Sequence, residues 1–125
     1  MKNNKVASVD YIFRKPKFPV IVNIDGILIC GKSSITLSRR LAKINFQDEK
    51  TFYAIDSTCE GWSFYPNRWL LSPLTTKKRW TKIELINLFN NRKNKNSEEQ
   101  EYSKKSLSSK RLDLIFMEIF SLLNK

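Results

Sequence analysis

Residues 20–30 read Val-Ile-Val-Asn-Ile-Asp-Gly-Ile-Leu-Ile-Cys and decide the fold class of this chain. The runs at 20–24 and 27–30 are rich in β-branched side chains, which favour strands. The Asp25-Gly26 pair between them fits a type I′ turn, because that turn needs positive φ at both central residues. The stretch therefore predicts an antiparallel hairpin.

Further strand-like runs lie on both sides of the hairpin. Residues 9–13, 51–55, 62–65 and 68–71 show the short alternation or the β-branched and aromatic content of strands. Because turn residues separate most of these runs, we expect a small, mostly antiparallel sheet of four to five strands.

Two helices are marked by their capping residues. The Ser-Ser pair at residues 33–34 can cap a helix that we expect to reach about Asn45. Thr81 and Glu84 have the spacing of a capping box, which predicts a second helix over residues 81–91. With a third helix near the C-terminus, the chain is predicted to be a single α+β domain.

The third helix is expected over residues 106–123 and is apolar on most sides. Such a helix is either packed within a core or shared with a partner. A protein partner or a homodimer through residues 107–123 is therefore the main alternative function. Two segments are predicted to lie outside the packed core: a loose tail at residues 1–8 and an exposed or disordered loop at residues 90–101.

Length and composition indicate the cellular compartment in which we expect the protein. A chain of 125 residues supports about one hydrophobic core. No stretch approaches the roughly 20 apolar residues of a membrane span, and no apolar signal core follows the N-terminus. We therefore expect a cytoplasmic protein with no membrane partner, in which Cys30 and Cys59 are reduced thiols.

The chain contains no histidine, which limits its chemistry. Ser-His-Asp and Cys-His nucleophiles are excluded, and two cysteines supply only half of an ordinary zinc site. A small metal-dependent hydrolase or nuclease that uses Asp25 or Asp56 is a second alternative. Turn residues more often bond their own backbone, so we expect no resident metal, no cofactor and no catalytic residues.

Residues 26–33, Gly-Ile-Leu-Ile-Cys-Gly-Lys-Ser, match the P-loop pattern G-x-x-x-x-G-K-[ST]. A P-loop needs the residues between its glycines to curl, so that backbone N–H groups converge on a phosphate. The intervening residues here are apolar and follow the hairpin turn, so we interpret them as the return strand. Lys32 could still assist anion binding, because it precedes a helix N-terminus.

The net charge of +11 is concentrated in two blocks. Residues 14–43 hold seven cations and one anion, and residues 61–97 hold eight cations and one anion. Residues 98–125 hold five of each. A codon bias toward lysine would scatter the cations, so their segregation indicates a surface for a phosphate-rich partner.

Aromatic residues interleave with the second block, as they do in proteins that stack unpaired bases. Trp80 follows three cations and is equally well interpreted as the hydrophobic staple of the helix after it. We predict largely sequence-independent binding of nucleic acid, RNA or DNA, through its phosphate backbone. The predicted contacts are Lys32, Arg39, Arg40, Lys43, Arg68, Lys77, Lys78, Arg79, Trp80, Lys82, Arg92 and Lys93.

Overall fold

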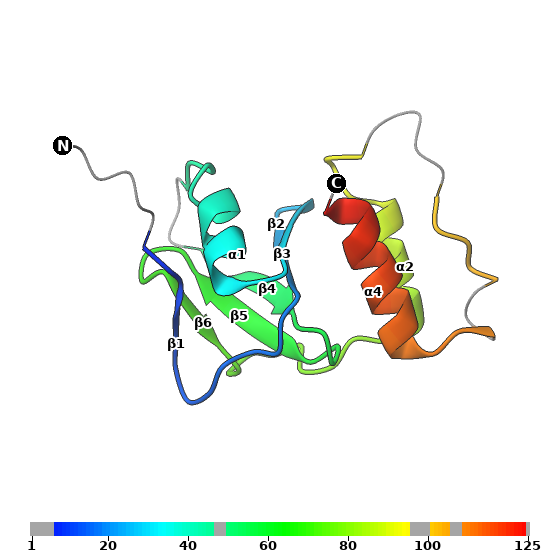
Figure 1. Cartoon of the computed structure of the whole chain (residues 1–125), viewed down its shortest axis with the longest axis horizontal. Helices are drawn as coiled ribbons and strands as arrows, with labels where there is room; N and C mark the ends of the chain where they lie inside the picture. The colour runs from blue at the N-terminus through cyan, green and yellow to red at the C-terminus, as the bar shows by residue number, and fades with distance from the viewer. Residues whose placement is uncertain (1–6, 47–49, 96–100, 106–108, 125) are drawn as a thin grey trace.

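The computed structural model describes residues 7–46, 50–95, 101–105 and 109–124. Six strands form one mixed sheet in the order β1-β6-β5-β4-β2-β3, and helices pack against it (Figure 1). The elements are β1 (Asp10–Tyr11), β2 (Val20–Ile24), β3 (Ile27–Gly31), α1 (Ser34–Leu41), β4 (Phe52–Ile55), β5 (Gly61–Tyr65), β6 (Leu70–Ser72), α2 (Lys82–Asn90) and α4 (Leu112–Leu123).

The hairpin of β2 and β3 forms as predicted. The two strands pair antiparallel with Ile24 opposite Ile27. Asp25 and Gly26 between them have φ values of 51° and 95°, the positive values that a type I′ turn requires. Residues 27–31 are extended, so the P-loop-like string forms a strand and does not curl around a phosphate.

The sheet is larger and more mixed than the sequence predicts. The α+β class is confirmed, but the sheet has six strands instead of four to five, and it is not purely antiparallel. β1 runs parallel to β6, with Asp10 opposite Leu70. This pair joins segments far apart in the chain, and local alternation carries no information about such pairing.

Apolar residues form one cluster on each side of the sheet, as the alternation of β2 requires. Val22 packs with Leu37 of α1 and the buried Trp62, whereas Ile21 packs with residues of α2 and α4. α1 and the α2–α4 pair accordingly lie on either side of the β2–β3 hairpin (Figure 1).

Two helices are shorter than predicted. α1 ends at Leu41 instead of residue 45, because the chain then tightens into a turn in which the Lys43 N–H donates to the Arg40 carbonyl at 3.3 Å. α4 begins at Leu112, because the backbone of its N-cap residue Arg111 is extended. Residues 106–108 lie outside the described residues. The capping box that opens α2 is confirmed.

The predicted tail and loop are described only in part. Residues 1–6 and 96–100 lie outside the described residues. Next to them, the Ala7 carbonyl accepts a hydrogen bond of 2.7 Å from the indole of Trp69. The Lys93 N–H donates to the Gly26 carbonyl at 2.7 Å, which fixes the start of the predicted loop against the β2–β3 turn.

Candidate nucleic-acid interface

Two segments with three cations each meet around residues 56–61, which comprise the loop that joins β4 to β5 and the first residue of β5. We call residues 14–17 the first basic segment and residues 77–79 the second. The first segment lies against one side of the loop, where the Ser57 N–H donates to the Lys17 carbonyl at 2.9 Å. The two segments come from different basic blocks of the sequence, and only folding brings them together.

Gly61 allows the second basic segment to lie against the loop. Its N–H donates to the Lys78 carbonyl at 2.8 Å, and the Trp80 N–H donates to the Cys59 carbonyl at 3.0 Å. A Cβ atom at Gly61 would lie 1.6 Å from the carbonyl oxygen of Lys77. Only glycine permits so close an approach, so the second segment is held at a fixed place beside the loop.

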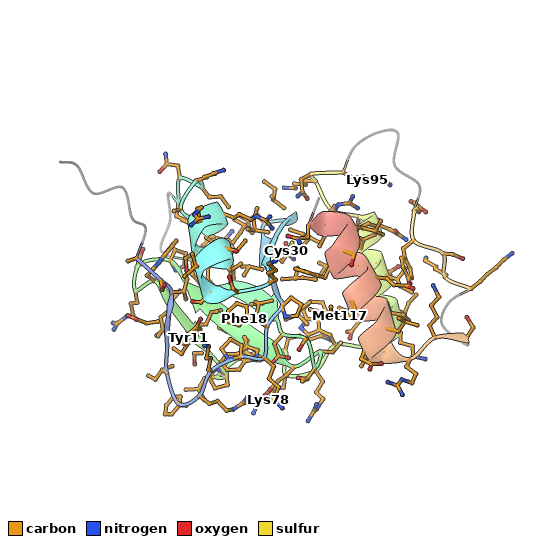
Figure 2. The ribbon with its side chains drawn as sticks, viewed as in Figure 1. Tyr11, Phe18, Cys30, Lys78, Lys95 and Met117 are labelled. Atoms are coloured by element: carbon orange, nitrogen blue, oxygen red, sulfur yellow. The ribbon has the colours of Figure 1, made fainter. Side chains whose placement is uncertain are left out.

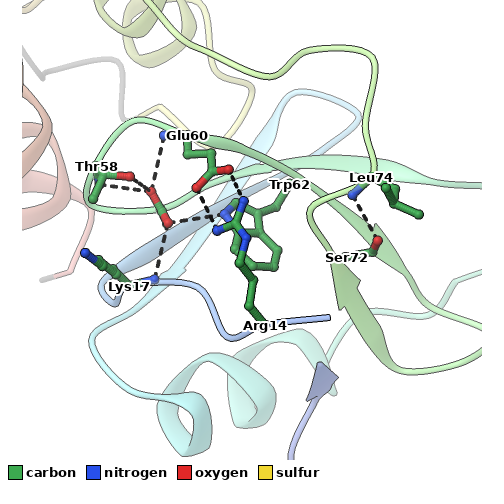
Figure 3. A network of polar contacts seen from close by, with 8 residues as sticks. Arg14, Lys17, Thr58, Glu60, Trp62, Ser72 and Leu74 are labelled. Carbon is green, nitrogen blue, oxygen red and sulfur yellow. Dashed lines mark hydrogen bonds and ion pairs between the residues drawn. The ribbon is translucent and has the colours of Figure 1, made fainter. Parts of the chain in front are cut away.

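Asp56 organises the loop from the inside and is only 1% exposed. One of its oxygens accepts from the N–H and hydroxyl of Thr58 and from the N–H of Glu60, and the other accepts from the N–H of Lys17 and the indole of Trp62 (Figure 3). Five donors at 2.6 to 3.2 Å satisfy this carboxylate. Asp56 therefore ties the first basic segment to the loop, and its hydrogen bonds do not favour the metal-ligand alternative.

Glu60 lies among cations from both segments. Arg14 pairs with its carboxylate through two hydrogen bonds, and the Arg14 guanidinium also lies 5.0 Å from the ring centre of Trp62. These hydrogen bonds, with the positive fields of Arg14, Arg79 and Lys17, lower the pKa of Glu60. Arg14 bonds Glu60, and Arg79 forms an antiparallel β-bridge with Glu60, so cations of both segments flank this residue.

We call the six cations of the two segments the basic surface: Arg14, Lys15, Lys17, Lys77, Lys78 and Arg79. The acidic groups beside it are Asp56, Glu60 and Glu84, so six positive charges meet three negative ones and leave a local excess of +3. Glu84 pairs with Lys77. Lys17, Lys78 and Arg79 are exposed and have no ion-pair partner within the described part of the chain.

Trp80 borders the basic surface and is half-buried. Its ring centre lies 5.2 Å from Nζ of Lys77, and Tyr53 packs against it edge to face at 6.3 Å. The ring also packs against the core cluster that contains Leu85, as expected of a hydrophobic staple. Trp80 therefore lies beside a cation, as a nucleic-acid contact would, and also packs on the core, as a hydrophobic staple would.

The cations predicted on the first helix do not join the basic surface. Arg39 and Lys43 are exposed near the carboxyl end of α1, at the top of Figure 1, whereas the chain around Lys78 lies at the bottom of the same view (Figure 2). Lys32 is exposed just before α1. Arg39 and Lys43 therefore lie apart from the basic surface, whereas Lys32 precedes Ser34, which accepts a hydrogen bond from Tyr11 beside the first basic segment.

Arg40 is turned inward, although the sequence analysis predicts it as a nucleic-acid contact together with its exposed neighbour Arg39. Its guanidinium donates to the Cys30 carbonyl at 2.9 Å and to Oδ1 of Asn124 at 2.7 Å. Arg40 thus connects α1 to β3 and to the end of α4, a structural role that the periodicity does not reveal.

The rest of the second basic block is dispersed. Arg68 is exposed in the β5–β6 turn, Lys82 is half-buried in the first turn of α2, and Lys93 packs along the β2–β3 turn. Arg92 departs most from the expected role, because only 6% of it is exposed. Its guanidinium lies 3.9 Å from the ring centre of Phe89, and burial lowers its pKa. Burial removes Arg92 from the surface on which the sequence places it.

The sequence-based list omitted the first basic segment. Arg14, Lys15 and Lys17 were counted in a basic block but were not assigned to the site, because neither a helix face nor neighbouring tryptophans marked them. The dense run Arg-Lys-Pro-Lys at 14–17 was the available signal. Its relation to residues 77–79 depends on the fold.

The carboxylates and cysteines of the described residues do not form a second candidate site. The described residues contain no group of three or more His, Cys, Asp or Glu side chains that could hold a metal ion. Asp25 is exposed and pairs with Lys50 at 2.9 Å. Cys30 and Cys59 are free and buried, and burial raises the pKa of both thiols, that of Cys59 to about 12. Both are therefore protonated at neutral pH.

No helix in the described ranges is both long enough and apolar enough for a membrane span. Comparisons of the chain with protein-family models, with curated proteins and with solved structures find no match.

Proposed function

We propose that this protein binds nucleic acid through the basic surface, by sequence-independent contacts with phosphate groups. One observation carries the proposal: the two basic segments meet around residues 57–61, where Arg14 bonds Glu60 and Arg79 forms a β-bridge with it. Each phosphate that a cation neutralises releases counterions, which favours binding at low salt. The hydrogen bonds that hold both segments in place reduce the entropy lost on binding.

The surroundings of the basic surface support contact with the backbone rather than reading of base sequence. The surface is built from loops and not from an exposed helix. A helix-turn-helix needs two helices joined by a short turn, but three strands separate α1 from α2. Phosphate contacts position a protein on nucleic acid without carrying sequence information.

The proposal is tested by anisotropy with labelled single strands and duplexes of mixed sequence, titrated at several salt concentrations. One phosphate contact each for Lys17, Lys78 and Arg79 predicts that log K falls against log salt with a slope of roughly −2 for single strands. Replacing Lys78 and Arg79 together by alanine should reduce that slope by about 1.4.

The double variant Arg39→Ala/Lys43→Ala is the matched control. It removes the same two charges from exposed positions near the carboxyl end of α1. We expect it to retain the wild-type slope. Equal effects of the two double variants would show that net charge, and not the basic surface, determines binding.

A second candidate function is self-association through α4. This helix buries Ile115, Phe116, Ile119 and Phe120 against the core, so most of its apolar excess is used within the chain. Leu114, Met117 and Leu122 nevertheless remain 40 to 45% exposed. An exposed apolar stripe of this kind suits a second copy of the chain. Light scattering that finds a monomer at every concentration rejects this candidate.

A further inference from the structure

Phe13 precedes the first basic segment and keeps most of its ring in water. It is 72% exposed, more than any other large apolar residue in the described ranges, and Ile12 before it is 40% exposed. Folding usually removes such surface from water, since burying a phenylalanine side chain stabilises a protein by roughly 1.5–3 kcal/mol. The position of Phe13 therefore needs an explanation other than core packing.

The backbone holds Phe13 in a conformation that aromatic residues rarely adopt. Its φ is 69°, and the Arg14 N–H donates to the Ile12 carbonyl at 2.8 Å across it. This is a γ-turn with positive φ at its centre, a strained turn for any residue with a Cβ atom. Glycine or asparagine would fit here with less strain, so a phenylalanine at this turn points to a role in function.

The turn is anchored on both sides. The Ile12 N–H donates to the Leu71 carbonyl at 3.3 Å, which fixes the residue before Phe13 to the sheet. On the other side, Arg14 is held by Glu60 and by the ring of Trp62. The β1–β2 connection that carries Phe13 bends at the lower edge of Figure 1. The ring is thus presented from a braced turn, which lowers the entropy cost of binding to it.

Building on the proposed function, we infer that Phe13 is a stacking platform for an unpaired nucleobase, while the adjacent cations bind phosphates of the same strand. Proteins that bind single strands without sequence preference combine these two elements, because every base has a π-face. Paired bases are stacked inside a duplex and do not reach an external ring. The inference thus specifies single-stranded nucleic acid as the ligand.

An anionic membrane would present the same charge complementarity, but the apolar area is too small for it. The exposed apolar side chains in or near the two segments are those of Ile12, Phe13 and Leu74, and they come from separate loops. Even a single fatty-acyl chain gives only marginal membrane binding. Vesicles of phosphatidylglycerol are therefore included in the test as a competing ligand.

The test compares oligothymidylate with an abasic strand of equal length and charge. Phe13→Ala should weaken binding to oligothymidylate by roughly 5- to 100-fold, the range of stacking on one aromatic ring, and leave the abasic strand and the salt slope unchanged. Phe13→Trp should retain the wild-type affinity. Ile27→Ala removes an exposed apolar residue at the start of β3, at 38% exposure, and should change neither affinity.

Phe13→Gly separates loss of stacking from loss of folding. Glycine accepts positive φ, so this variant should unfold at or above the wild-type temperature while binding oligothymidylate as weakly as Phe13→Ala. Equal losses on both strands, or no loss on either, overturn the stacking role and leave phosphate binding intact. Phe13-dependent binding to duplex or to vesicles, in preference to oligothymidylate, also overturns it. If the wild type binds neither strand, the proposed nucleic-acid-binding function is itself wrong.

Discussion

The backbone N–H of Gly61 donates to the carbonyl of Lys78 at 2.8 Å, which joins the β4–β5 loop to the second basic segment. The same loop contains Asp56, whose carboxylate accepts from the N–H of Lys17 in the first basic segment. One short loop therefore positions cations that lie far apart in the sequence. The integrity of this loop should control both stability and nucleic-acid binding.

Gly61→Ala should disrupt this junction. The added Cβ would meet backbone atoms, at 1.6 Å from the Lys77 carbonyl oxygen, and backbone cannot rotate away as a flexible side chain can. We expect the free energy of unfolding to fall by about 2–4 kcal/mol, from overpacking and a lost hydrogen bond, and nucleic-acid binding to weaken. Urea denaturation and anisotropy measure the two effects.

Gly26→Ala is the control for Gly61→Ala. Its φ of 95° also disfavours alanine, so we expect a loss of about 1–2 kcal/mol. It lies in the β2–β3 turn, so binding of the folded variant should be unchanged. If Gly61→Ala is as stable as the wild type, the second segment does not depend on this close approach.

Asp56→Asn should destabilise the protein without any dependence on metal. The side-chain NH₂ of asparagine would face N–H and O–H groups that donate to the carboxylate in the wild type. We expect this to lower the free energy of unfolding by about 2–4 kcal/mol. Thermal unfolding of the wild type should not respond to magnesium or to a chelator. A magnesium-dependent rise in unfolding temperature that Asp56→Asn abolishes would instead support a metal site.

Arg40 and Arg39 are neighbours with the same charge and different environments. Arg40→Ala removes bonds to Cys30 and Asn124 and should lower stability by about 1–2 kcal/mol. Arg39→Ala changes an exposed residue and should stay within about 0.5 kcal/mol of the wild type. Both variants should bind nucleic acid with wild-type affinity. A larger stability loss at Arg39 than at Arg40 would contradict the assignment.

Glu60→Gln should strengthen nucleic-acid binding, the opposite of every cation substitution in the basic surface. It removes a negative charge that interacts with Arg14, Lys17 and Arg79 and would repel an approaching phosphate. Anisotropy at low salt should show tighter binding of both strand types. Weaker binding by the folded variant would show that Glu60 positions Arg14 more than it repels the ligand.

The same substitution should change the pH dependence of stability. Hydrogen bonds from Arg14 lower the pKa of Glu60 below its ordinary 4.5, so the folded state favours the ionised form. The stabilisation is therefore complete above about pH 4.5 and is lost as pH falls through the lower folded-state pKa. The difference in the free energy of unfolding between the wild type and Glu60→Gln, measured by urea denaturation, should be largest near neutral pH. It should approach zero in acid. A difference that does not change with pH contradicts the ion pair.

The features that the sequence predicted correctly depend on local chemistry. The Asp25-Gly26 turn and the Thr81 capping box are determined by a few adjacent residues, and both form. The parallel pairing of β1 with β6 could not be predicted, because it depends on contacts between distant segments. The length of helix α1 was also hard to predict, since the helix ends at Leu41 without a proline or glycine to mark its end.

The candidate site was predicted only where neighbouring residues form it. Residues 77–80 were identified from their density of charge beside an aromatic ring; residues 77–79 belong to the basic surface and Trp80 borders it. The burial of Arg92 and the inward turn of Arg40 were not visible, because helical periodicity does not show which partners a long side chain finds. Residues 14–17 gain their role only from the neighbours that the fold provides.

Mapping of amide chemical shifts by NMR, during titration with oligothymidylate, tests the central claim most directly. We predict that the amide signals of residues 12–15, 17, 57–61 and 77–80 shift together and saturate at one ligand concentration. The chemical shifts of amides at the carboxyl end of α1 and along α4 should not change. Shifts confined to α1 or α4, or no shifts at low salt, would contradict the assignment of the basic surface as the nucleic-acid interface.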